Sequence, residues 1–487
     1  MINTLQKKSG KLIDKINLSN EKYFILGFLI INLLIKLIFI SSKDISHDEP
    51  FTIFHAQATW CELWLMLNSE PNPPLFYILL HFWVKTFGTS ALSVRFLPVL
   101  FSSLAVIPLF RLSKLFGRNT LAIAVVAIYT FSRANMASAH DTRSYSLFAL
   151  LVLLSTVELF DIIRTSNNKK GKFIVLSLYY FLMIYSHHIG FIVGVIHLVI
   201  ILFNYRRIDK KTIFGLLLTG GCTFVLYSHY IPVFLNSFSQ TTTSGTVNSK
   251  PSVEAIYGMI RYYMNVPVVA VLSLALFTVF TVKIFTLKNK RIEKSLLILF
   301  VGMYFSMYFL SDVVVLFVNR YVLFISSYYY LIIVLGIKFL TKNTITRISI
   351  LLALIIPLIV TVDLKSDNKR YVHEIVDIIK NKETANTAII ICPTWTNHRF
   401  AYYYHRGIFQ DYSNFDDRLL EQNIYSINSK EKLNEIDLDQ FDKVIYLDGW
   451  AEVVDPELRI LHALDSSYSK SYENYSFKGY RILTFDK

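Results

Sequence analysis

The sequence has few cysteines, few charged residues and no internal repeat or low-complexity tract. Its three cysteines, Cys61, Cys222 and Cys392, lie far apart and form no C-x-x-C pair, so the chain encodes neither a disulfide framework nor a zinc site. Only 17% of the 487 residues are charged, whereas 53% are hydrophobic and 15% aromatic. This balance excludes a soluble protein of this size, and several apolar runs are long enough to span a bilayer. The sequence therefore predicts an integral membrane protein.

The N-terminal stretch MINTLQKKSGKLIDK lacks the features of a cleavable leader. It is basic, but the apolar run behind it extends from about Tyr23 to Ile40, and no small-residue cleavage site follows. We expect this run to be retained as the first membrane helix.

The formal charge of +14 is unevenly distributed along the chain. From Asp363 to the end there are 16 Lys and Arg against 21 Asp and Glu, a net charge of −5, which leaves +19 for the residues before. That excess lies in short loops between apolar runs, which argues against nucleic-acid binding. About 24 basic residues fall on one alternating set of loops and about 8 on the other, so the positive-inside rule places the first set in the cytoplasm. The basic set comprises KKSGKLIDK, RLSKLFGR, RTSNNKKGK, YRRIDKK, KIFTLKNKRIEK and KFLTKNTITR.

Twelve apolar runs are present, but twelve crossings cannot keep every basic loop on one side. The run 75–88 is the shortest and contains His81 and Lys85, so we expect it to lie along the outer surface of the membrane. Eleven transmembrane helices then fit every loop, with the N-terminus cytoplasmic and everything after about residue 363 outside. The spans lie roughly at 23–40, 95–115, 119–133, 144–163, 172–186, 189–204, 212–234, 266–286, 294–310, 320–338 and 346–362.

The C-terminal tail is predicted to be a second, extracytoplasmic domain (363–487) after the membrane domain (1–362). TAIIICP, KVIYLDGW and GYRILTFDK have the composition of short strands, and RYVHEIVDIIKN has the apolar spacing of an amphipathic helix. The order of these elements predicts a small α/β domain. The polar stretch 413–440 is expected at the surface, without an assigned structure. The predicted fold class is thus an α-helical polytopic membrane protein with a small C-terminal α/β domain.

Polar and ionisable side chains gather at the outer ends of different predicted helices. Of the eight histidines before residue 363, only His197 falls near the middle of a span. Such groups are costly at a membrane, so their convergence on one face predicts an outward-facing polar site. Snorkelling and loop hydration could explain single residues, but explain the whole set less well. The set comprises Asp48, Glu49, Glu70, Asn72, Arg95, His140, Asp141, Arg143, His187, His188, His229, Asn319, Arg320 and Tyr321.

The order of several motifs carries a resemblance to a known family. HDE follows the first span, and NPPLFYILLHFW, RFLP, DTRSYSLFALLVLLS, YSHHIGF and NRYVLF come after it in that order. Over roughly residues 20 to 340 the chain resembles the GT-C glycosyltransferases, in particular the bacterial branch similar to protein O-mannosyltransferases and lipid A aminoarabinose transferases. The resemblance implies transfer of a sugar from a polyprenyl-phosphate carrier to a glycan, lipid or protein acceptor at the outer side of the cell membrane.

The resemblance also implies a role for the acidic pair. The acidic residue after the first span is the catalytic base in the resembling families, and that position is Asp48 here. Asp48 could instead serve only as the N-cap of a helix beginning near Pro50, for which Asp and Pro are both suited. Glu49 could take part in catalysis or hold a divalent metal with the carrier phosphate, because carboxylate and phosphate oxygens suit Mg²⁺ or Mn²⁺.

Transfer from a lipid phosphate also needs charge stabilisation at the departing phosphate. Arg143 and Arg320 are predicted to bind it, because a planar guanidinium can grip phosphate through two hydrogen bonds. Arg320 could instead be an interfacial anchor beside Tyr321. The remaining predicted substrate-binding residues are Arg95, His187, His188 and Tyr321.

The chain departs from the family pattern at two positions. Where the aminoarabinose transferases have Lys before the proline after the surface loop, this chain has Asn72, so no phosphate role is predicted there. Asp141 occupies the region of a second loop acid, although HDTRSY differs from the local family pattern, and only a supporting catalytic role is predicted for it.

Two other classes of protein share some of these features. A transporter also gathers ionisable groups in a membrane, but near the midplane on broken helices, often in two similar halves. A receptor would bind its ligand through the tail stretch CPTWTNHRFAYYYHRG, which leaves eleven spans with polar outer ends unexplained. We retain a binding role for the tail only as a contribution to acceptor recognition.

Overall fold

The computed structural model describes residues 21–38, 40–41, 43–164, 170–243, 251–362, 371–477 and 479–487. The basic N-terminal stretch and the predicted domain boundary at residues 362 and 363 therefore fall wholly or partly outside the described residues.

Contacts divide the chain into two compact units. The membrane unit consists of Met1–Ile38, Leu67–Phe76 and Arg95–Leu364, and the sheet unit of Phe39–Met66, Tyr77–Val94 and Lys365–Lys487. The division of the chain at residue 362 stays a prediction, while the contacts group two earlier segments with the tail.

The membrane unit has a helix at each of the eleven predicted spans. In the described part of the chain, eight helices are long and apolar enough to cross a membrane, or nine if α8 is counted with α9 (Arg133–Ala139), which is bent from it by 60°. The other two, α2 and α11, have 17 residues each, at the lower end of the roughly 17–25 that a span requires. The helices are α2 (Glu21–Leu37), α6 (Ala91–Leu104) with α7 (Val106–Lys114), α8 (Asn119–Phe131), α10 (Tyr145–Arg164), α11 (Lys170–Ser186), α12 (Gly190–Asn204), α13 (Lys210–Tyr227), α16 (Pro267–Thr286), α17 (Arg291–Leu310), α19 (Ser326–Leu340) and α20 (Thr344–Thr361).

Shorter helices account for most of the remaining segments before the tail. The expected surface helix is α5 (Leu75–Phe87), whose 13 residues are too few to cross a bilayer. The others are α3 (Glu49–Ala56), α4 (Trp60–Leu67), α14 (Ile231–Thr243), α15 (Glu254–Tyr263) and α18 (Asn319–Val322).

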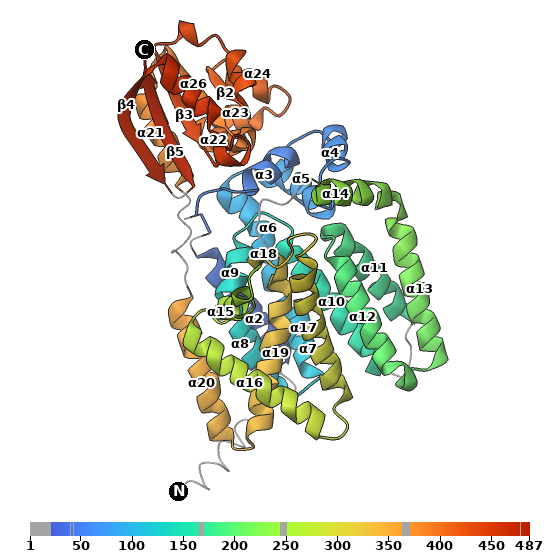
Figure 1. The fold of residues 1–487 in the computed structure, drawn as a ribbon. Coiled ribbons are helices and arrows are strands. Elements are labelled where there is room, and N and C mark those ends of the chain that lie inside the picture. The colour runs from blue at the N-terminus through green and yellow to red at the C-terminus, as the bar shows by residue number, and fades with distance from the viewer. Residues whose placement is uncertain are drawn as a thin grey trace. The chain divides into compact units, whose positions relative to one another are not determined.

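Helix α19 lies in the interior of the membrane unit and packs against α8, α16, α17 and α20 (Figure 1). Every residue from Ser326 to Ile337 is buried, as expected for a helix that is apolar on all sides. A Cβ at Gly336 would collide with the carbonyl of Leu276 in α16, so glycine permits close approach of the two backbones. The hydroxyls of Tyr329 and Ser273 also hydrogen-bond across this helix pair, at 2.7 Å.

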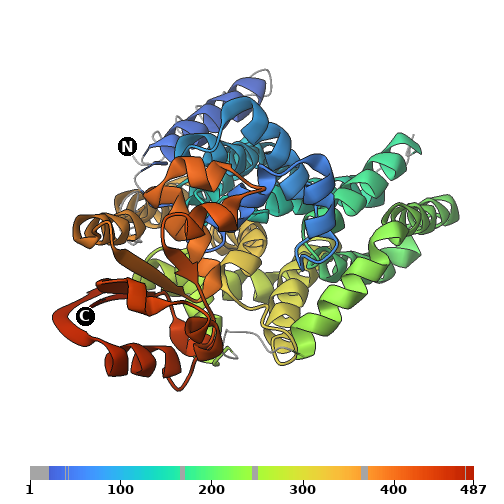
Figure 2. The ribbon, with the colours of Figure 1, turned by 90° about the horizontal axis from the view of Figure 1, so that it is seen from above.

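Helices α10, α11 and α13 pack through a separate apolar cluster in which Leu159, Leu176 and Leu216 are buried. α11, α12 and α13 lie side by side in Figure 1, and the view from above places the green helices α13 and α14 at the outer edge of this unit (Figure 2). Phe214, Leu217 and other apolar residues of α13 are exposed, as suits a helix that faces lipid.

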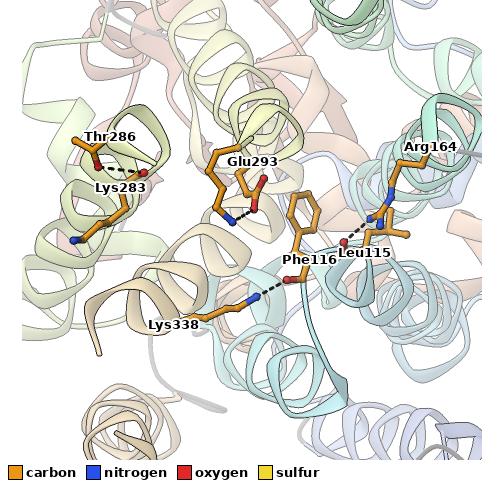
Figure 3. A network of polar contacts seen from close by, with 8 residues as sticks. Leu115, Phe116, Arg164, Lys283, Thr286, Glu293 and Lys338 are labelled. Carbon is orange, nitrogen blue, oxygen red and sulfur yellow. Dashed lines mark hydrogen bonds and ion pairs between the residues drawn. The ribbon is translucent and has the colours of Figure 1, made fainter. Parts of the chain in front are cut away.

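Several described basic residues near the ends of the membrane helices contact one another's segments at one end of the membrane unit. Figure 3 shows Lys338 Nζ donating to the carbonyl of Phe116 (2.9 Å) and Arg164 donating to the carbonyl of Leu115. Both acceptors lie just after the end of α7, where helix carbonyls lack intrahelical partners and favour cations. Three further contacts at this end join Lys114 with Glu21, Arg291 with Phe203, and Lys290 with Phe339. The contacts thus connect the segment after α7 with the last turns of α10 and α19, and the segment between α16 and α17 with the last turns of α12 and α19.

The sheet unit contains the predicted α/β domain. Its five strands lie in the order β2-β1-β3-β5-β4, with β1 parallel to β2 and β3, and β5 antiparallel to β3 and β4. Alternating side chains of β1 and β3, including Ile390 and Tyr446, pack on α25 and α26, and Figure 1 shows α21 on the opposite face from α26. The elements are α21 (Val372–Lys382), β1 (Thr387–Cys392), α22 (Asn397–Tyr404), α23 (Arg406–Gln410), α24 (Phe415–Leu420), β2 (Ile424–Ser426), α25 (Lys430–Asn434), β3 (Lys443–Asp448), α26 (Arg459–Ser467), β4 (Ser469–Phe477) and β5 (Tyr480–Asp486).

Candidate active site

The predicted site residues form two groups, one in each compact unit. Asp48 and Glu49 belong to the sheet unit. The other seven belong to the membrane unit and are Arg95, Asp141, Arg143, His187, His188, Arg320 and Tyr321.

The acidic pair stands at the start of α3, which begins at Glu49 with Pro50 in its first turn. Asp48 holds the N-cap position, but its side chain makes no capping hydrogen bond. Glu49 is completely buried, and its Oε2 accepts a hydrogen bond from the backbone N–H of Ser46 (3.3 Å). A buried carboxylate needs such partners, so Glu49 helps to order the turn that leads into the helix. The two carboxylates therefore differ, and the capping role proposed as an alternative for Asp48 is not seen in the geometry.

In the membrane unit, His187 follows α11 and packs among aromatic rings from other helices. Its ring centre lies 5.3 Å from that of Tyr321 and 6.2 Å from that of Tyr145. The guanidinium of Arg320 lies over the Tyr321 ring, 5.3 Å from its centre. Burial, reinforced by the neighbouring His188 and by the guanidiniums of Arg143 and Arg320, lowers the pKa of His187 to about 3. His187 is therefore neutral at physiological pH, with two guanidiniums near enough to influence it.

The hydrogen bonds of His187 also indicate which ring nitrogen carries the proton. Nδ1 accepts from the backbone N–H of Ile189 (3.3 Å), so the proton of the neutral ring is assigned to Nε2. Nε2 is buried and has no hydrogen-bond partner among the described residues. A buried donor without a partner is costly, which makes this N–H suited to an acceptor oxygen of a bound ligand.

His188 points away from this group although it is the next residue. Its ring packs on Phe234 (4.8 Å between centres), and Nδ1 lies 3.4 Å from the hydroxyl of Tyr227. Nothing in the sequence distinguishes the two histidines, but in the structure only His187 packs against Tyr321. In the neighbouring segment the amide of Asn72 donates to the carboxylate of Glu70, so it is engaged within its own loop.

The remaining predicted residues of the membrane unit lie at different depths. Arg95 is completely buried in α6. Asp141 is half-buried in the turn before α10, where its carbonyl accepts from the N–H of Arg143 (2.7 Å). Arg143, Arg320 and Asp141 are all close enough to Tyr145 to influence it electrostatically.

Lys36 is a buried basic residue to which none of the sequence motifs points. It is completely buried in α2, where its Nζ donates to the hydroxyl of Ser102 (2.6 Å) and lies 4.9 Å from the centre of the Tyr129 ring. Nε2 of His140 lies 2.5 Å from the carbonyl of Lys36, so the ring of His140 points into the interior of the membrane unit. A lysine inside an apolar run was a signal available in the sequence, because intramembrane charges are rare and need partners.

The tail stretch considered as a ligand site instead contacts two earlier segments of its own chain in the sheet unit. Within the sheet unit, Arg406 donates to the carbonyl of Thr89 (3.3 Å), and the hydroxyl of Tyr403 accepts from the N–H of Ile45 (2.5 Å). These contacts join residues more than 300 positions apart, and no local pattern could have indicated them.

A divalent metal at Glu49 stays a prediction. Among the described residues, no group of three or more His, Cys, Asp or Glu side chains is placed to hold a metal ion. Glu49 is already engaged with Ser46, and metals of this kind require six or more oxygen ligands. The donors present therefore do not by themselves fit a resident metal.

Comparisons with solved structures identify the class of fold. ArnT from Cupriavidus metallidurans bound to undecaprenyl phosphate is 11% identical, with a TM-score of 0.59 over 96% of this chain and 98% of that chain. Its apo state gives a TM-score of 0.61 at 11% identity, over 95% of this chain and 98% of that one. The predicted GT-C fold is therefore confirmed. No protein-family model and no curated protein sequence matches the chain.

An archaeal enzyme shares the fold over much of its length. The oligosaccharyltransferase AglB from Archaeoglobus fulgidus, in complex with an inhibitory peptide and a dolichol-phosphate, is 11% identical, with a TM-score of 0.55 over 95% of this chain and 74% of that chain. The oligosaccharyltransferase of that organism in complex with Zn and sulfate gives 12% identity and a TM-score of 0.55, over 94% and 72%. At identities this low, the structural likeness establishes the shared fold alone.

Proposed function

We propose that this protein is a membrane glycosyltransferase that moves a sugar from a polyprenyl-phosphate carrier to a glycan, lipid or protein acceptor. The observation that carries the proposal is the neutral His187, whose unpartnered Nε2–H lies in the field of Arg143 and Arg320. One neutral donor and two guanidiniums suit a lipid-linked phosphate ester. The shared fold supports the proposal, because ArnT was solved with undecaprenyl phosphate and AglB with a dolichol-phosphate.

The proposed chemistry assigns one role to each group of residues. A hydroxyl or amine of the acceptor attacks the anomeric carbon, the bond from that carbon to the phosphate oxygen breaks, and the carrier leaves as polyprenyl phosphate. Asp48 accepts the proton of the attacking group. Arg143 and Arg320 stabilise the negative charge on the leaving phosphate, with Arg95, His187, His188 and Tyr321 as further binding residues. Asp141 is proposed as a supporting acid in this group.

The proposed reaction predicts a defined stoichiometry. Purified protein in liposomes, supplied with a polyprenyl-phosphate sugar and an acceptor extract, should release one polyprenyl phosphate for each sugar transferred. The donor and acceptor can be identified by comparing surface glycolipids and glycoproteins of cells with and without the protein, by mass spectrometry. A sugar that crosses the liposome membrane still attached to its carrier, without transfer, would instead indicate a transporter.

We further propose that the basic end of the membrane unit faces the cytoplasm and that the tail lies outside. A reporter active only outside the cytoplasm should then work when fused after Lys487 and fail when fused after Lys170. Equal expression of both fusions, checked by immunoblot, is the control. Activity at Lys170 would overturn the proposed orientation.

A further inference from the structure

Within the sheet unit, the segment that leads to Asp48 is tied to the C-terminal domain. Arg399 of α22 donates from Nε to the carbonyl of His47 (3.0 Å) and from Nη1 to the hydroxyl of Tyr480 (3.3 Å). Its guanidinium lies 5.6 Å from the centre of the Trp450 ring, and the residue is only 7% exposed. A buried guanidinium with these partners is held in one orientation, so it can fix the carbonyl that it binds.

The residue next to Asp48 has an unusual backbone conformation. His47 has a φ of 54° and Trp450 a φ of 72°, both in the left-handed region that bulky residues rarely adopt. Their rings stack with an interplanar angle of 13° and a centre-to-centre distance of 6.2 Å. Such conformations persist only where the surroundings enforce them, and they occur often at functional sites. The stack and the Arg399 hydrogen bond both act on the one residue that precedes Asp48.

The contacts come from the edge of the sheet that commonly holds ligands in α/β folds. α22 follows the parallel strand β1, and Trp450 follows the parallel strand β3. Ligands of open α/β sheets bind at the carboxyl ends of such strands. The N–H of Ala451 donates to the carboxylate of Asp448 (2.7 Å), which fixes the turn around Trp450. In this unit, residues at that edge instead contact the loop of the same chain that contains His47.

Other tail residues hold the preceding positions of the loop. The backbone N–H of His373 donates to the carboxylate of Asp44 (3.1 Å), and the His373 ring lies 2.7 Å from the same group. Further along, the ring nitrogen of His55 in α3 lies 3.1 Å from the hydroxyl of Tyr412. The tail thus contacts the segment on both sides of the acidic pair.

We propose that the C-terminal domain positions Asp48, and that Arg399 is the positioning residue through which it does so. This inference rests on the proposed function, in which Asp48 is the base. Arg399 acts through the carbonyl of His47 and has no part in binding the donor. Its loss should therefore lower kcat and leave the KM for the lipid-linked donor unchanged.

The chain offers a matched control for the test. Arg406 also belongs to the tail, donates to a backbone carbonyl (Thr89) and covers an aromatic ring, with its guanidinium 3.7 Å from the centre of Tyr402. It holds a loop that carries none of the predicted site residues. Arg399→Gln should lower kcat by about 10- to 100-fold, since a misplacement of about 1 Å can cost about 10²-fold. Arg406→Gln should leave kcat near the parental value. Arg399→Lys, which keeps one donor, should recover part of the loss.

Two further measurements keep the test independent of folding. Tyr480→Phe removes only a hydroxyl, so it should fold normally and lower kcat by a few-fold. Amide hydrogen exchange should become faster in peptides covering residues 44–57 of Arg399→Gln and stay unchanged there in Arg406→Gln.

The possible results separate this inference from the proposed function. If Asp48→Asn is inactive while Arg399→Gln keeps the parental kcat, the positioning role is wrong and the proposed function stands. Equal losses of kcat in Arg399→Gln and Arg406→Gln would show that Arg399 contributes only to the general stability of the protein, and would overturn the inference. If the wild-type protein transfers no sugar from any polyprenyl-phosphate donor, the proposed function fails and the catalytic meaning of these contacts fails with it.

Discussion

Asp48→Asn is expected to lower the rate of sugar transfer by about 10²–10⁴-fold, the usual contribution of a general base. Asparagine has nearly the same size and caps a helix about as well as aspartate, but it cannot accept the proton of the attacking group. The side chain of Asp48 makes no capping bond, so its replacement should leave α3 intact. Transfer rates of the purified variant, together with binding of the polyprenyl-phosphate sugar, measure the effect.

Glu62→Gln is the matched control because it removes another carboxylate from the same segment of the sheet unit, Phe39–Met66. Glu62 accepts hydrogen bonds from the N–H and hydroxyl of Thr59 at 2.8 and 2.7 Å, which order the start of α4, and a longer one from the hydroxyl of Ser413 at 3.4 Å. We expect its transfer rate to stay near the parental value. A near-parental rate in Asp48→Asn would contradict the assignment, and the base would then have to be sought at Asp141 or a histidine.

Arg320→Lys is expected to lower transfer by about 10²–10³-fold, as removal of one charge-stabilising donor commonly does. Lysine keeps the positive charge but loses the planar pair of donors that matches a phosphate. Membrane insertion and yield should persist, since lysine keeps the positive charge at this partly buried position. The measurement is kcat at saturating donor, compared with the amount of folded protein.

Arg261→Lys provides the control for this second prediction. Arg261 lies exposed on α15, so the same exchange there should change neither yield nor transfer. Parallel losses of protein and activity in Arg320→Lys would instead support the alternative in which Arg320, lying over Tyr321, anchors the helix at the interface.

The membrane helices were predictable because their determinants are local. An apolar run of sufficient length must form a helix in lipid, and the alternating basic loops excluded α5 as a span. The strands β1, β3 and β5 were also recognised from their apolar composition. β2 was missed because it has only three residues inside a polar stretch, and β4 because its sequence SKSYENYSF is mostly polar.

The candidate site was predictable only as a set. Topology alone places Arg143, His187 and Arg320 at helix ends, and the structure brings them together. The divergence of His187 and His188 could not be read from the sequence, because it depends on which neighbouring helix supplies Tyr321 or Phe234. The contact between His47 and Arg399 joins positions 352 residues apart and is set by tertiary packing.

That long separation has a consequence for how the protein is made. At synthesis rates of about 5–20 residues per second, His47 leaves the ribosome roughly 20–70 s before Arg399. During this interval the acidic segment has none of the bonds that the tail later supplies. A chain that ends between α20 and α22 would contain all of its membrane helices yet lack Arg399 and Trp450, the partners of His47. Under the proposed function, the segment that carries Asp48 is therefore completed only after the tail has been synthesised, and a chain that ends before α22 would lack the residues that position Asp48.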